Sequence, residues 1–121
     1  MFACIGQLEG REKNTLFHQS DSGEALTIAE QLTVETGEII DLPADVVHSI
    51  ENPGETLSRA LHLYAGDFSA LMEKRSLWDS DNHQEKSFSF KELVGESIKT
   101  MQNSKNDIGL RELAKAIPSA G

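Results

Sequence analysis

The sequence predicts a mainly β protein, a sandwich or small barrel, followed by a helical C-terminal tail. Up to Tyr64, short apolar or alternating segments are separated by turn residues, as in antiparallel sandwiches and small barrels. After Tyr64, apolar residues recur at helical spacing. At 121 residues, the chain has room for one domain with a modest core. The main turn signals are Glu9-Gly10, Asp21-Ser22-Gly23, Thr36-Gly37 and Asn52-Pro53-Gly54.

Six strands are expected, and the chain starts inside the first because its opening residues are already apolar. Pro43 fixes φ and lacks a backbone donor, so we expect it at a corner between two strands. His48 alternates in period two with Val46 and Ile50, so it should point with them into the enclosed interior. The expected strands are Met1 to Leu8, Arg11 to His18, Ala25 to Val34, Ile39 to Leu42, Val46 to Ile50 and Leu57 to Tyr64.

Helices are expected in the last part of the chain. Apolar spacing predicts a short helix from Asp67 to Arg75 and a longer one from about Phe90 to Met101, with Ser89 as its N-cap and Glu92 completing a capping box. A last helix should be capped by Asp107 and stopped by Pro118. The apolar stripes of these helices are interpreted as packing surfaces that cover the barrel or bind a second copy. The expected division is residues 1–78 for the barrel, 79–88 for a linker and 89–121 for the helical tail.

Charge and composition limit the possible partners. The formal net charge of −9 disfavours nucleic acids and anionic membranes, because both attract basic surfaces. The single Cys4 rules out an internal disulfide. No apolar run reaches transmembrane length, and the N-terminus lacks a signal-peptide pattern, so we expect a cytoplasmic protein.

One motif has a specific spacing. Gly37, five residues, Pro43, one residue, Asp45, two residues, His48, three residues and Asn52 resemble the second conserved motif of the cupin superfamily. In that motif a second glycine stands where this chain has Asp45, a residue type that tolerates left-handed backbone angles better than most. The resemblance implies a cupin jelly-roll barrel, a double-stranded β-helix, with His48 as a metal ligand. From its residues alone, a lone inward histidine is more often a hydrogen-bonded core residue.

A second segment adds to this resemblance. Ser58-Arg59-Ala60-Leu61-His62-Leu63-Tyr64 is similar to the strand of cysteine dioxygenase and related thiol dioxygenases that carries a Ser-His-Tyr relay beside a three-histidine iron. The resemblance implies that His62 and Tyr64 are catalytic, with Tyr64 acting on bound substrate or oxygen. Ala60 stands where the relay serine would be. The alternative is a buried His62–Tyr64 pair that only stabilises the core.

The metal set of that family is incomplete in this sequence. Cupins supply two further ligands as His-x-His, but no histidine precedes His18 and no His-x-His occurs in the chain. Working metal sites use about three protein ligands, so Fe(II) is expected to be weakly bound or absent. His18 and His83 are expected to be solvated. Cys4 lies near the position of a cysteine that some family members cross-link to the tyrosine; a small buried thiol is the alternative.

The resulting hypothesis is an iron-dependent dioxygenase of the thiol-dioxygenase type, present as an incomplete or N-terminally shortened cupin barrel and acting on a small-molecule thiol. The alternative is a non-catalytic cupin that binds a small molecule or acts through dimerisation. A homo-oligomer is expected in either case, because a barrel without its first strands exposes sheet edges and the helix from Phe90 carries an apolar stripe. The substrate, the native metal and the oligomeric state stay open.

Overall fold

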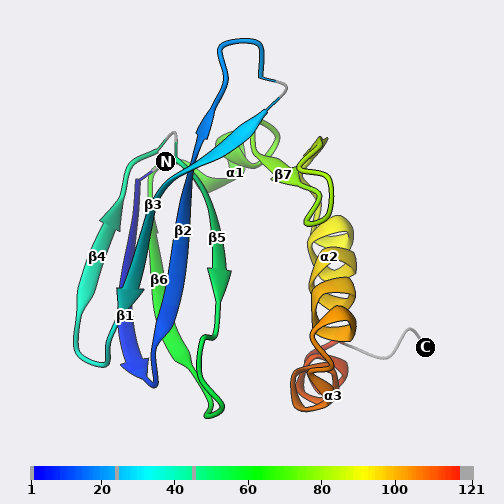
Figure 1. Ribbon diagram of the computed structural model, residues 1–121. Coiled ribbons are helices and arrows are strands. Elements are labelled where there is room, and N and C mark those ends of the chain that lie inside the picture. The colour runs from blue at the N-terminus through cyan, green and yellow to red at the C-terminus, as the bar shows by residue number, and fades with distance from the viewer. Residues whose placement is uncertain (1, 24, 45, 118–121) are drawn as a thin grey trace. The chain divides into compact units, whose positions relative to one another are not determined.

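The computed structural model describes residues 2–23, 25–44 and 46–117. The chain divides into two compact units with the boundary between Leu71 and Met72, and each unit is described by itself. The protein is mainly β, with three antiparallel sheets (Figure 1). Among the described residues, no helix is long and apolar enough to cross a membrane.

The first unit contains two three-stranded sheets. The first sheet has the order β4-β1-β6 and the second has the order β3-β2-β5, with every neighbouring pair antiparallel. All six expected strands are present, with ends shifted by up to two residues. The bounds are β1 Phe2–Glu9, β2 Glu12–Gln19, β3 Leu26–Val34, β4 Ile39–Leu42, β5 Val47–Glu51 and β6 Arg59–Ala65. The short helix α1, Phe68–Met72, follows β6.

The described strands form no closed barrel. β4 and β6 are the edges of the first sheet, and β3 and β5 are the edges of the second. The expectation of a mainly β protein is therefore confirmed. In place of the expected barrel, the described strands of the first unit form two open sheets. Asp45, which was expected to form part of the corner after Pro43, lies outside the described residues.

Strand alternation defines the inner face of each sheet. Ile5 on β1 pairs with Ile40 and His62, so these side chains share one face of the first sheet. On the second sheet, Glu12 pairs with Val34. Among the residues that the structure describes, the apolar side chains that are almost fully buried are Ile5, Val34 and Leu42. The apolar core is small because polar side chains are buried in the same unit.

Gly10 forms the turn from β1 to β2, and therefore from one sheet to the other. Its φ is +65°, and a Cβ at this position would lie 2.5 Å from the carbonyl oxygen of Leu57. Any other residue would be strained by both the backbone angle and the close approach. This turn sets the register that brings Glu12 opposite the first sheet.

The second unit combines a hairpin with two helices. The hairpin strands are β7, Ser76–Trp78, and β8, Glu85–Ser87, and the helices are α2, Phe90–Asn103, and α3, Asp107–Ala116. The sequence did not predict this hairpin, and β8 lies within the segment expected to be a linker. Its strands have three residues each and include Glu85 and Lys86, so they lack an apolar strand signal.

The helix caps follow local sequence signals with one correction. Ser89 caps α2 as expected, because its Oγ accepts the N–H of Glu92 at 3.1 Å. The expected cap of α3 was wrong. Asn106 is the N-cap, with its Oδ1 accepting the N–H of Gly109 at 2.8 Å, and Asp107 is the first helical residue. Pro118, the expected stop, lies outside the described residues.

Candidate functional site

His48 lies on the inner face of the second sheet. It belongs to β5 and pairs with Leu16, two residue pairs away from the Asn14–Ile50 pair and on the same face. Its Nδ1 lies 3.2 Å from Oδ1 of Asn14. Strand alternation predicted that the His48 side chain points inward, and in the structure it makes a polar contact inside the unit. Ile50 on the same strand is half exposed, because β5 is an edge strand.

A buried carboxylate continues this contact toward the first sheet. Asn14 is fully buried, and its Nδ2 donates to Oε1 of Glu12 at 2.9 Å. Oε2 of Glu12 lies 3.5 Å from Nε2 of His62 on β6. The contacts therefore run from β5 through β2 to β6 and connect the two sheets. We call Gln7, Glu12, Asn14, His48 and His62 the interior polar cluster.

The Glu12 carboxylate determines the protonation pattern along the cluster. A carboxylate only accepts, so Asn14 must present its NH₂ to Glu12 and its carbonyl oxygen to His48. His48 must then donate from Nδ1, which places the ring lone pair on Nε2 in the neutral form. An acidic residue on one sheet thus specifies the tautomer of a histidine two side chains away.

Gln7 is the most distinctive member of the cluster. Its side chain is 2% exposed. Gln7 pairs with Ala60, which precedes His62 by two residues on β6, so Ala60 and His62 are separated by roughly 7 Å along the strand. Its Nε2 donates to the carbonyl of Glu9 at 2.8 Å and to Oγ of Ser58 at 2.9 Å. Because the carbonyl of Glu9 can only accept, the amide orientation is determined. Oε1 of Gln7 is buried and has no hydrogen-bond partner among the described residues.

The structure places the two residues expected to be catalytic on one face of β6. His62 pairs with Ile5 and Tyr64 pairs with Ala3, and Tyr64 is 41% exposed. Cys4 pairs with Leu63 on the opposite face of the same sheet. A cross-link between Cys4 and Tyr64, as some relatives of the resembled family carry, does not fit this arrangement, because alternation directs the two side chains to opposite faces.

Sequence reasoning missed Gln7, Glu12 and Asn14. The signal was available in part, since Glu12 and Asn14 are two residues apart and must share a face of their strand. Polar residues on a strand are normally assigned to the solvent side. Only the pairing of β2 shows that this face is the interior.

The side chains that could ligate a metal ion bear on the expected iron site. Within residues 2–23, 25–44 and 46–117, no group of three or more histidine, cysteine, aspartate or glutamate side chains is arranged to hold a metal ion. Nδ1 of His48 contacts Asn14, and Nε2 of His62 lies 3.5 Å from the Glu12 carboxylate. The described residues therefore do not assemble the three-histidine iron centre implied by the resemblance.

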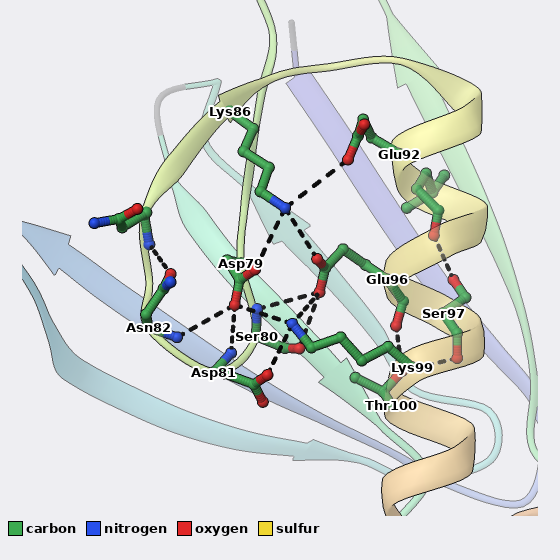
Figure 2. Close-up of polar contacts among 12 residues, drawn as sticks. Asp79, Ser80, Asp81, Asn82, Lys86, Glu92, Glu96, Ser97, Lys99 and Thr100 are labelled. Atoms are coloured by element: carbon green, nitrogen blue, oxygen red, sulfur yellow. Dashed lines mark hydrogen bonds and ion pairs between the residues drawn. The ribbon is translucent and has the colours of Figure 1, made fainter.

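The second unit has a separate group of charged residues around Asp79, shown in Figure 2. Lys86 and Lys99 both contact Asp79, at 3.3 and 3.1 Å, and both contact Glu96 on α2. Lys99 also contacts Asp81 at 2.9 Å. We call these five residues the hairpin–helix ion cluster. They link the β7–β8 loop to α2.

Hydrogen bonds set the charge states in this cluster. The backbone N–H of Asp81, followed by Lys99, holds the pKa of Asp79 well below its usual range. Burial alone would raise the pKa of Glu96, but hydrogen bonds from Ser80 and Lys86 outweigh it and lower the pKa. Asp81 and Asp79 raise the pKa of Lys99. Every carboxylate here faces a lysine, so the cluster is a structural ion network.

No family model, no curated protein and no solved structure matches this chain.

Proposed function

We propose that the first unit is a cupin-like domain that binds a small polar molecule carrying N–H or O–H donors at the interior polar cluster. The observation that supports this most directly is the buried Oε1 of Gln7, which has no hydrogen-bond partner among the described residues. A buried acceptor without a donor costs about 1–3 kcal/mol. A donor from a bound molecule would remove that cost.

The surrounding chemistry favours the same class of ligand. The Glu12 carboxylate is buried, offers acceptor oxygens and contacts His62, which lies two residues along β6 from Ala60, the strand partner of Gln7. Ligands that bring donors, such as amines and alcohols, complement acceptors, whereas a ligand that offers only acceptors does not. The jelly-roll part of the proposal is supported by two antiparallel sheets bridged by inner-face side chains, and by His48 shortly after the Pro43 corner.

The test compares two cations of equal charge. Methylammonium carries N–H donors, whereas tetramethylammonium carries none. We expect methylammonium and ethanolamine to shift the Gln7 side-chain amide signals in ¹⁵N NMR spectra, and tetramethylammonium to leave them unchanged. Gln7→Met should weaken methylammonium binding by about tenfold, because one hydrogen bond is lost.

The matched control is Gln31→Met, since Gln31 is an exposed glutamine on β3 whose Nε2 contacts Thr15. This variant should retain binding. Equal responses to both cations, or no response to any donor-bearing probe, would contradict the proposal. In that case a buried water serves Gln7.

An iron-dependent thiol dioxygenase is the second candidate. It is favoured by the tautomer of His48, because metal-ligating histidines are oriented by a hydrogen bond from their other ring nitrogen. When bound, iron would supply the redox chemistry of oxygen activation, and two further ligands would be needed beyond His48. His62 and Tyr64, which share a face of β6, are the proposed catalytic pair.

Iron content separates the two candidates. We expect the chain dialysed against Fe(II) to keep far less than one iron per chain after gel filtration, and to show no iron-dependent oxygen uptake with cysteine or mercaptopropionate. Stoichiometric iron that His48→Ala removes would favour the dioxygenase. In that event Tyr64→Phe should keep the iron and lose about a hundredfold in rate.

A further inference from the structure

The outer face of the first sheet is unusually apolar. Strand register places Ile39, Gly6 and Leu61 in one row and Asp41, Cys4 and Leu63 in the next. These rows point away from Ile5 and the interior. The large apolar side chains on this sheet, which we call the apolar outer face, are exposed by 47% to 70% and comprise Phe2, Leu8, Ile39, Leu61 and Leu63.

The outer face of the second sheet is more polar. Two of its rows are polar, with Lys13 contacting Glu51 and Gln31 donating to Thr15, whereas one row is apolar and consists of Val47, Phe17 and Ile28. Polar rows are usual on the solvated face of an antiparallel sheet. Because both sheets belong to one unit, the apolar outer face of the first sheet indicates a surface that is covered by another protein surface.

The size of the face indicates the kind of partner. A fully exposed side chain of this size presents roughly 150–200 Å², so five side chains at these exposures offer on the order of 500 Å² of apolar surface. A standard protein interface buries about 800 Å² per partner, of which roughly 60% is apolar. The exposed apolar area therefore matches one half of such an interface.

The charge of this face is compatible with a second copy of this chain as the partner. The net charge of −9 makes two copies repel each other, and contact through a face with few carboxylates keeps that repulsion small. In the two central rows, Asp41 is the one charged residue, and it lies on the edge strand β4 and accepts a hydrogen bond from Cys4. A two-fold axis would set apolar rows against apolar rows, because such an interface uses the same patch twice.

We propose that the outer face of the β4-β1-β6 sheet is a homodimer interface, centred on Leu61 and Leu63 and packed sheet against sheet. This surface differs from the sheet edges and the α2 stripe considered from the sequence. It is also independent of the interior polar cluster, since alternation places the two on opposite faces of the sheet.

Sedimentation of the full chain tests the interface. We expect the native chain to dimerise in the micromolar range, and Leu63→Glu and Leu63→Lys each to raise the dissociation constant at least tenfold. Opposite charges are used because general repulsion between acidic copies would be strengthened by Glu and relieved by Lys. Ile28→Glu is the control, because Ile28 is 62% exposed but lies on β3 of the other sheet; its dissociation constant should stay within threefold.

The single cysteine gives a second measurement that does not depend on a variant folding. Cys4 lies in the row of Leu63, so dimerisation should shield it. Its rate of maleimide labelling should fall as the native chain is concentrated through the dissociation constant. A native chain that stays monomeric at 100 µM, or a labelling rate independent of concentration, would overturn the proposal. A monomer would mean that another part of the chain covers this face.

Discussion

The two units place charged side chains in opposite settings. In the first unit, the carboxylate of Glu12 is buried between two sheets and contacts the Asn14 amide and the His62 ring. In the second unit, Asp79 and Glu96 meet two lysines and backbone N–H groups at the end of a hairpin. In the ion cluster every carboxylate contacts a lysine and the residues are close in sequence, whereas the interior polar cluster has an excess of acceptors and depends on contacts distant in sequence.

This difference explains why the first unit is the candidate for binding. A network in which every carboxylate already has a donor partner offers a ligand few new hydrogen bonds. A buried acceptor without a hydrogen bond, such as Oε1 of Gln7, is stabilised when a ligand donates to it. If the two clusters differ in this way, removing a side chain from the interior polar cluster should lower the free energy of unfolding more than removing one from the ion cluster.

The largest effect is expected for Glu12→Leu. Removing this carboxylate leaves the buried Nδ2 of Asn14 without its acceptor, which should cost about 2–4 kcal/mol of unfolding free energy. Hydrogen exchange of the β1 and β2 amides measures this loss. Glu12→Gln, which keeps an acceptor for Asn14, should cost clearly less. Equal exchange in Glu12→Leu and the native chain would mean that the cluster does not hold the sheets together.

A smaller effect is expected for Asp79→Ala. It removes an acceptor for two lysines and for the N–H of Asp81, but these donors can turn to water. Trp78, the only tryptophan, lies on β7 next to Asp79, so its fluorescence reports unfolding of this unit in urea. The midpoint should fall for Asp79→Ala and hardly change for Asp81→Ala, since Asp81 is 62% exposed. Equal shifts would show that burial of Asp79 does not matter.

Acid should weaken the second unit with a defined sign. The folded pKa values of Asp79 and Glu96 lie below their ordinary values, so their contribution is fully present above about pH 4–5 and is lost as the pH falls below that range. Trp78 fluorescence in urea should show stability decreasing from pH 5 to pH 2. The decrease should be shallower in Asp79→Asn. An unchanged slope in that variant would assign the acid effect to other groups.

The smallest effect is expected from salt. Raising NaCl to 1 M shortens the screening length to about 3 Å, which weakens partly exposed ion pairs such as Lys99–Asp81 more than buried contacts. The urea midpoint reported by Trp78 should fall slightly. Exchange of the β2 amides beside Glu12 should not speed up. An unchanged urea midpoint together with faster exchange of the β2 amides would mean that the interior polar cluster, and not the ion cluster, is the one sensitive to salt.

Local patterns determined most of the secondary structure. Alternating apolar residues and turn signals predicted all six strands of the first unit, because these signals act over a few neighbouring residues. Ser89 was predicted as a cap for the same reason. The β7–β8 hairpin was missed, since strands of three residues are too short to show a periodic signal and are held by contacts such as Lys86 with Asp79.

Tertiary structure alone decided the interior. Period two shows that Glu12 and Asn14 share a face, but it does not show whether that face meets solvent or the other sheet. The same ambiguity applies to β6, where Leu61 and Leu63 are 63% and 64% exposed while His62 between them contacts Glu12 in the interior. The side of a strand is chosen by what packs against it. Residues distant in the chain make that choice, and no single stretch of sequence contains it.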